Sequence, residues 1–157
     1  MNGGERDALR QISYGLYVLT TVRGPDVNAI TCNWLTQISF EPLAVVVAIE
    51  KQSRSHQLLK ESGVFAINIL GKDQTSLARR MAVPHRINPH KLAGVTHHPG
   101  VTGAPLLDEA IAFLECEVRQ VVEVDGDHTL FVADVVAGAA TRAGEPLTLK
   151  EARLQYK

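Results

Sequence analysis

The stretch "ITCNWLTQISFEP", residues 30–42, sets a run of hydrogen-bonding side chains directly before the most apolar stretch of the chain, "LAVVVAIE" at 43–50. The apolar stretch has the length and the β-branched content of a buried strand. The polar one also begins and ends with apolar residues, but its middle does not suit a core because buried polar groups need hydrogen-bond partners. We therefore interpret residues 30–42 as an interrupted strand whose polar groups serve something other than the core.

Composition predicts one globular domain, residues 1–157, with 45% hydrophobic and 21% charged residues. The formal net charge of -1 gives no reason to expect binding to nucleic acid or to a membrane. The N-terminus lacks the apolar centre of a signal peptide, and the longest apolar run, 43–49, is too short to span a bilayer. Two cysteines, Cys32 and Cys116, suggest neither a disulfide framework nor a metal site, so we expect a reduced, cytoplasmic protein.

Short strands and turns surround the opening stretch. A hairpin is expected where "LYVLTTV" and "VNAIT" flank the turn sequence "RGPD". Further strands are predicted at 43–49, 64–70, 112–124 and 129–136, with another at 146–150. Because strands do not alternate regularly with crossover helices, the pattern favours a mainly β, antiparallel barrel with two or three short peripheral helices over a doubly wound sheet.

Three helices are predicted, at 5–13, 53–63 and 73–82. The second has Ser53 or Ser55 as its N-cap and Gly63 at its end, and the third has Asp73 as its N-cap. Residues 84–105 are rich in proline and glycine and form an irregular excursion, which at this length is expected to be functional or to cover something.

Several common sites are not indicated. The chain has no Gly-rich dinucleotide fingerprint, no P-loop and no GxSxG motif. Of the six histidines, the adjacent His97 and His98 would point to opposite faces of a strand, so no metal site is expected. Cys32 is interpreted as a small buried hydrophobe. Asn68 lies inside a buried strand and makes either a core hydrogen bond or a ligand contact.

The segment "SRSH" at 53–56 opens a helix directly after a strand. A helix N-terminus offers free N–H groups and the positive end of the dipole, and here two serine hydroxyls and a guanidinium are added. Ser53, Arg54 and Ser55 therefore suit a phosphate group. Helix capping alone would explain the two serines equally well.

Four segments have a familiar order and spacing. They are "TCNWLTQISFEP", "LAVVVAIEKQSRSHQLLKESGVFAINIL", "GVTGAPLLDEAIAFLECEV" and "GDHTLFVADVV". Together they resemble the flavin reductase-like family of FMN-binding split β-barrels, and the resemblance runs from about residue 6 to residue 150. It implies an antiparallel split barrel of six to seven strands, FMN as the cofactor with FAD as the alternative, and a homodimer with flavin near the subunit interface.

The resemblance also implies roles for individual residues. Ser53, Arg54 and Ser55 would hold the flavin phosphate, and the catalytic residue would be His128, near the flavin and the nicotinamide of NAD(P)H. The residues expected to line the flavin are Thr31, Cys32, Asn33, Trp34, Leu35, Thr36, Gln37 and Ser39. The interrupted strand would then exist because a flavin needs hydrogen bonds at its pyrimidine edge. Trp34 and Gln37 replace smaller residues of many relatives, and Trp34 either stacks on the flavin or plugs the core.

Two functions follow from the resemblance. In the first, the protein is an NAD(P)H:flavin oxidoreductase, and its reduced flavin serves a partner such as a monooxygenase component. In the second, it is a non-catalytic FMN-binding electron-transfer flavoprotein. His128 favours the first, whereas a flavin closed off from a second ring would favour the second. A barrel that has lost its flavin is a third interpretation.

Overall fold

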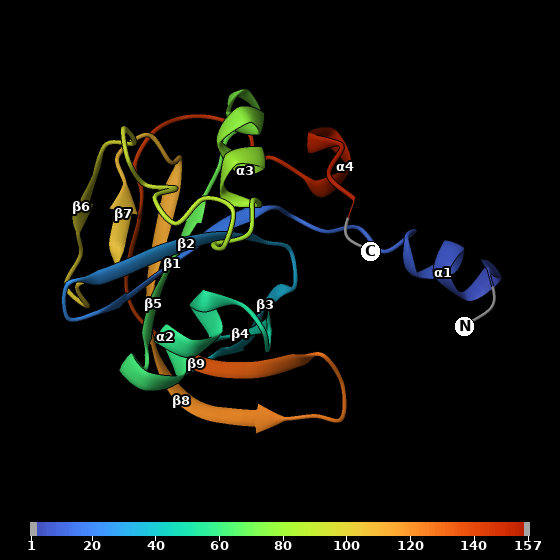
Figure 1. The fold of residues 1–157 in the computed structure, drawn as a ribbon, viewed down its shortest axis with the longest axis horizontal. Coiled ribbons are helices and arrows are strands. Elements are labelled where there is room, and N and C mark those ends of the chain that lie inside the picture. Colours follow the sequence, from blue (N-terminus) through green and yellow to red (C-terminus); the bar gives the residue numbers. More distant parts are fainter. Residues whose placement is uncertain (1–2, 156–157) are drawn as a thin grey trace.

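The computed structural model describes residues 3–155, in which strands dominate. Within this range the chain forms a seven-stranded antiparallel sheet, a two-stranded sheet and four short α-helices (Figure 1). The strands are β1 (Tyr17–Arg23), β2 (Asp26–Cys32), β3 (Leu35–Phe40), β4 (Leu43–Glu50), β5 (Val64–Ile69), β6 (His97–Pro99), β7 (Pro105–Leu107), β8 (Ala112–Glu123) and β9 (His128–Ala140). The helices are α1 (Gly3–Leu9), α2 (Arg54–Ser62), α3 (Thr75–Met81) and α4 (Leu149–Ala152), with a 3₁₀ turn η1 (Lys72–Gln74) before α3. The prediction of a mainly β, antiparallel fold is confirmed.

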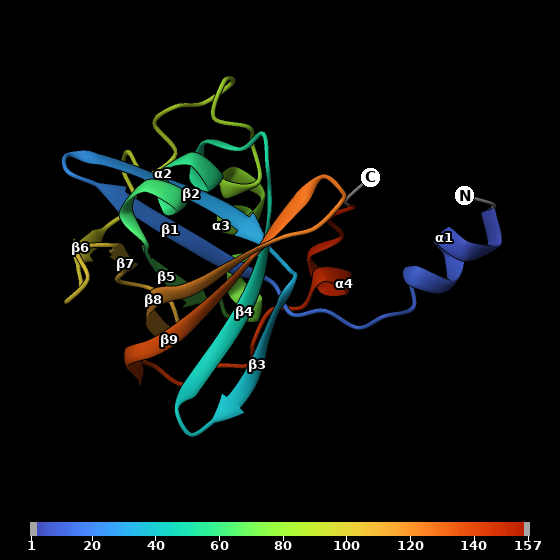
Figure 2. The ribbon, with the colours of Figure 1, turned by 90° about the horizontal axis from the view of Figure 1, so that it is seen from below.

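The order of the large sheet is β2-β1-β5-β8-β9-β4-β3. Two strands that follow each other in the chain, β2 and β3, therefore lie at opposite edges of the sheet, and Asn33 and Trp34 join them. Figure 2 shows the β1–β2 and β3–β4 hairpins running away from this junction in different directions. The predicted interrupted strand 30–42 is thus the end of one edge strand and the whole of the other.

Apolar clusters lie on both faces of the sheet. Leu19 and Phe131 belong to one cluster, which Leu59 of α2 covers, while Val18 packs in another cluster with Met81 of α3. Successive residues of a strand point to opposite faces, so β1 is buried on both sides. Edge strand β2 is therefore paired with a strand that is buried on both faces.

Helix α2 follows the prediction at both ends. The hydroxyl of Ser53 accepts a hydrogen bond from the backbone N–H of His56 at 3.1 Å, and Gly63 closes the helix with a φ of 70°. The predicted cap of the third helix is wrong. Asp73 lies inside the 3₁₀ turn and pairs with Arg142 at 3.1 Å. The N-cap position of α3 is Gln74, whose side chain makes no cap bond to α3 and instead accepts from the Gly71 N–H at 2.9 Å.

Two further predictions need correction. Residues 146–150 do not form a strand, because only two isolated bridges, Gly71 with Pro146 and Gly15 with Thr148, form there before α4 begins. Helix α1 ends at Leu9 rather than at residue 13. It has no buried residue and extends away from the body of the molecule (Figure 1).

The excursion 84–105 is anchored to the sheet by one buried carboxylate. Glu115 accepts hydrogen bonds from the backbone N–H groups of Val101 and Thr102, at 3.1 and 2.9 Å, and from the Thr102 hydroxyl at 2.7 Å. Asn68 makes the core hydrogen bond that was one of its two interpretations, since its Oδ1 accepts from the N–H of Leu107 at 2.8 Å. These bonds fix the β6–β7 hairpin against the sheet.

Candidate functional site

The predicted flavin-lining segment is divided by the strand boundary into a buried part and an exposed part. Thr31, Cys32 and Asn33 are buried at the end of β2. The hydroxyl of Thr31 donates to the carbonyl of Ala78 in α3 at 2.6 Å, and burial raises the pKa of the Cys32 thiol to about 12. Cys32 is therefore the small buried hydrophobe that was expected.

The exposed part of the segment lies on edge strand β3. Thr36 and Gln37 are exposed, and Leu35 and Ser39 are half-buried. Trp34 precedes the strand with 42% of its surface exposed, so it does not plug the core. A shallow, mostly apolar cavity of about 320 Å³ lies here, lined by Tyr14, Trp34, Leu35, Thr36, Val46, Ala48 and Leu130.

His128 lies against this tryptophan. The two rings are 4.6 Å apart with their planes tilted by 52°. The Nδ1 of His128 is 2.6 Å from the carboxylate of Asp127, which can only accept, so Nδ1–H donates. Asp127, in the turn between β8 and β9, thus orients the His128 imidazole, which lies next to the start of β3.

In the predicted phosphate segment, local bonds occupy both serines. Ser53 caps α2 and donates to the carbonyl of Glu50 at 2.9 Å. The Ser55 hydroxyl is buried and accepts from Asn28 Nδ2 at 3.0 Å. Arg54 lines a large cavity, although its guanidinium also lies 3.5 Å from Asp26.

This basic cavity has a volume of about 720 Å³ and lies between β2 and the excursion 84–105. Five of its lining residues can carry positive charge, against one acidic residue, Asp26. The five are Arg54, His85, His90, Lys91 and His97. Burial, followed by the nearby Arg54, lowers the pKa of His85. When the histidines are neutral, Arg54 and Lys91 leave one positive charge in excess of Asp26 in this lining.

Lys91 is the member of this cavity that sequence reasoning missed. It is only 2% exposed, its ammonium group donates to the carbonyl of Met81 at 3.0 Å, and burial lowers its pKa to about 8. No carboxylate pairs with it within residues 3–155. A charge buried without a counter-ion is costly, so an anion bound in the cavity would stabilise it.

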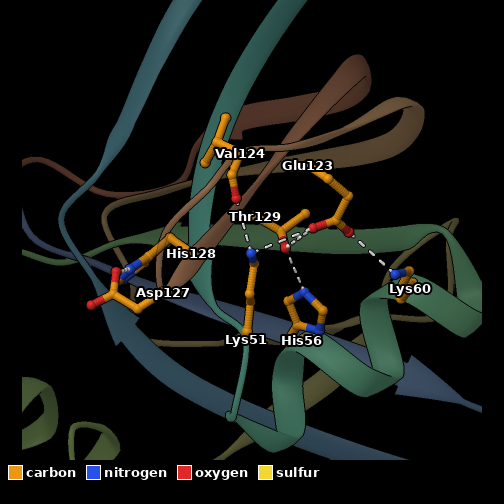
Figure 3. A network of polar contacts seen from close by, with 8 residues as sticks. All are labelled: Lys51, His56, Lys60, Glu123, Val124, Asp127, His128 and Thr129. Carbon is orange, nitrogen blue, oxygen red and sulfur yellow. Dashed lines mark hydrogen bonds and ion pairs between the residues drawn. The ribbon is translucent and has the colours of Figure 1, made fainter.

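A second group of polar residues, which the sequence did not indicate, lies behind the β8–β9 turn (Figure 3). His56 Nε2 is 2.9 Å from the Thr129 hydroxyl, which is itself 3.1 Å from Glu123. Lys60 bonds to the same carboxylate at 3.2 Å, and Lys51 bonds to the carbonyl of Val124 at 3.0 Å. The chain of contacts joins the start of α2 to the end of β8.

Two histidines of the excursion, His97 and His98, have local hydrogen-bond partners, whereas the buried Nδ1 of His85 has none in the described part of the chain. His98 lies 2.6 Å from Asp108, and His97 donates to the carbonyl of Val95 at 2.7 Å. Among the described residues, no three His, Cys, Asp or Glu side chains are grouped so that they could hold a metal ion. No helix in residues 3–155 has the length and apolarity needed to cross a membrane.

Comparison with known proteins gives a consistent result. Residues 9–156 match the family model described as a flavin reductase like domain. The ferric-chelate reductase (NAD(P)H) of Archaeoglobus fulgidus is 30% identical over 96% of this chain and 90% of its own. The chain also matches longer diflavin flavoproteins of Synechocystis and Nostoc, but spans only 23% of their length.

Solved structures agree with the sequence relatives. The NADH:FAD oxidoreductase SgcE6 of Streptomyces globisporus C-1027 superimposes with a TM-score of 0.83 and 29% identity, covering 94% of this chain and 90% of that one. Nitrilotriacetate monooxygenase component B of Mycobacterium thermoresistibile gives a TM-score of 0.84 and 28% identity, covering 92% and 80%.

Proposed function

Because the chain belongs to the flavin reductase-like family, we propose that it is an NAD(P)H:flavin oxidoreductase. One observation carries the proposal: β2 lines the basic cavity at its start and leads at its end to the exposed Trp34, whose ring contacts that of His128. A ligand that is anionic at one end and a planar aromatic at the other matches this arrangement. FMN has this form, whereas FAD carries its phosphates in the middle and adenine at its other end. When bound, the flavin would accept a hydride at N5 from nicotinamide C4.

At the anionic end, Arg54 and Lys91 would hold the phosphate. Arg54 would bond to it at the mouth of the cavity, and Lys91 would supply a partly desolvated charge. Ser53 and Ser55 would act through the helix, because their hydroxyls already have partners. This support is independent of the family relationship, since it rests on the cavity's own charges.

At the aromatic end, the exposed edge strand β3 would meet the polar edge of the ring. Thr36, Gln37 and Ser39 offer side-chain groups there, and an edge strand also offers unpaired backbone groups. Thr31, Cys32 and Asn33 would support the site from beneath, since they are buried. His128 would hydrogen-bond the incoming nicotinamide and set its approach.

We further propose that the protein is a homodimer. Large apolar side chains are exposed together on the β3–β4 hairpin, where Phe40 is 82% exposed and Ile38 and Leu43 are about half exposed. Exposed apolar residues gathered in this way are typical of an interface. A monooxygenase component is the proposed class of further partner, and the two free, buried cysteines suit the reducing cytoplasm.

One observation favours the second function, a non-catalytic electron-transfer flavoprotein. The Trp34 indole lies against the imidazole of His128, which is proposed to meet the nicotinamide. The indole, in place of the nicotinamide, could cover the face of the flavin. The two functions differ in one experiment. The visible spectrum of the protein, incubated with FMN and desalted, is recorded before and after adding NADH or NADPH without oxygen. Bleaching of the flavin band supports the oxidoreductase, and retained flavin that neither nucleotide reduces supports the alternative. A protein that retains no flavin and catalyses no reduction contradicts both.

A further inference from the structure

The turn that carries His128 is held from outside its own hairpin. The β8–β9 ladder ends at the pair Glu123 with Thr129, so residues 124–127 have no ladder partners. From the β4–α2 connection, the backbone N–H of Lys51 donates to the carbonyl of Asp127 at 2.9 Å. The Lys51 ammonium donates to the carbonyl of Val124 at 3.0 Å. The β4–α2 connection therefore hydrogen-bonds to the first and the last residue of the β8–β9 turn.

His56 provides a third, buried attachment (Figure 3). The Thr129 hydroxyl donates its hydrogen to the Glu123 carboxylate, so it must accept from His56 Nε2–H. This fixes the tautomer of His56. Burial lowers the pKa of His56, as do Lys60 and Lys51, and only Glu123 acts in the opposite direction. The imidazole is therefore neutral near pH 7 and serves as a hydrogen-bond donor.

Thr129 and His128 are adjacent on β9, so their side chains point to opposite faces. The Thr129 hydroxyl faces His56 and Glu123, while the ring of His128 faces Trp34. The β4–β9 ladder already pairs His128 with Glu50, and the bonds of the Thr129 hydroxyl add a second restraint on the rotation of the strand, and so on the direction of the imidazole on the other side. An apolar residue at position 56 would still pack on Phe131, whose ring lies 5.5 Å from that of His56, but it would lack the donor.

We propose that His56 is a positioning residue for nicotinamide-dependent reduction. Acting through Thr129 and Glu123, it holds the β8–β9 turn so that the His128 imidazole stays against Trp34. The kinetic part rests on the proposed function, because it needs His128 to meet the nicotinamide. The geometric part does not, because the contact between the Trp34 and His128 rings can be measured without any ligand.

The geometric test uses the emission of Trp34, the only tryptophan of the chain. A protonated imidazole in contact with an indole quenches its fluorescence, so at one fixed, mildly acidic pH the flavin-free, full-length protein should emit less than His128→Ala does. This difference in emission is the quenching step. His56→Leu should reduce its amplitude at least twofold, whereas His56→Gln, whose amide can still donate to Thr129, should retain it. An unchanged step in His56→Leu would overturn the proposal.

Two further variants cover the case in which His56→Leu fails to fold. Thr129→Val removes the middle of the chain of contacts, and Glu123→Ala removes the exposed end. Both should reduce the quenching step. If both are less stable to heat but keep the full step, the network is only structural and the proposal is wrong.

The kinetic test is a double-mutant cycle on flavin reduction by NADH. His56→Leu should lower the reduction rate about tenfold in the wild-type background and less than twofold in the His128→Ala background, because the two residues act as one unit. Equal losses in both backgrounds would overturn the positioning role. If the wild-type protein reduces no flavin, the proposed function fails, while the fluorescence step still decides whether His56 holds the turn.

Discussion

The indole ring of Trp34 lies 4.6 Å from the imidazole ring of His128, which brings together the start of β3 and the start of β9. Neither residue belongs to the buried core, since Trp34 is 42% exposed and His128 is half-buried. The pair therefore stands beside an open edge of the sheet, where a ligand can reach both rings. The proposed reaction is placed at this edge.

The first prediction concerns His128 itself. His128→Ala should lower NAD(P)H-dependent flavin reduction at least tenfold, an effect of about 1.4 kcal/mol, because the nicotinamide would lose an orienting hydrogen bond. Flavin affinity should stay near that of the wild type. Stopped-flow reduction with NADH and NADPH measures the rate, and His98→Ala, an exposed histidine on β6, is the control. A rate unchanged in His128→Ala would make this histidine a turn residue only.

The second prediction concerns Arg54. A charge-assisted bond to phosphate is worth roughly 1.5–3 kcal/mol, so Arg54→Ala should weaken FMN binding about tenfold or more. We expect a value near the lower end, because Asp26 already takes part of the charge of Arg54. Riboflavin, which has no phosphate, should be affected far less. Fluorescence titration with both ligands checks this, with Arg119→Ala on β8 as the control. Equal losses for FMN and riboflavin would mean that Arg54 acts through the fold.

The third prediction is a pH dependence set by Lys91. Its pKa of about 8 means that the ammonium group loses its proton as the pH rises through about 8. Only the protonated form attracts phosphate. FMN binding must then restore the proton, so affinity should fall by up to about tenfold per pH unit above that value. Lys91→Met should bind FMN weakly and without this pH dependence. Titrations from about pH 7 to 9.5 test it, and riboflavin affinity should stay flat. A wild-type FMN affinity constant over this range would contradict the prediction.

The fourth prediction concerns the dimer. Phe40→Glu places a charge on the exposed apolar residues of the β3–β4 hairpin and should raise the dimer dissociation constant at least about tenfold, since burying an unpaired charge is unfavourable. Val101→Glu, at a residue that is 80% exposed on the excursion, is the matched control and should leave the dimer intact. Sedimentation velocity over a concentration series provides the measurement. A wild-type protein that is monomeric throughout would contradict the homodimer.

The regular elements could be predicted because each is encoded locally. The apolar run 43–49 lies within β4, and Ser53 and Gly63 end α2 as their capping preferences require. The strand predicted at 146–150 failed because a short apolar pattern cannot show whether a partner strand is available, and only isolated bridges form there. Local pattern therefore predicts elements better than it predicts their pairing.

The candidate site was less predictable, because its contacts join distant parts of the chain. The sequence did indicate the part of the site that is proposed to bind the flavin ring, because the polar side chains around Trp34 would be absent from a core strand. Lys91 and His56 gave no such signal, since their burial depends on residues far away in sequence. The two serines beside Arg54 illustrate the opposite error, because a motif does not show that Ser53 caps α2 or that Ser55 bonds to Asn28 of β2.

The junction between β2 and β3 connects the two edges of one sheet. Every neighbouring pair in the sheet order is tied by a ladder of hydrogen bonds, whereas within residues 3–155 no ladder joins β2 to β3. Asn33 and Trp34 therefore connect two strands whose outer backbone groups the sheet does not use. A ligand held between these edges would hydrogen-bond to both strands without replacing any bond of the sheet.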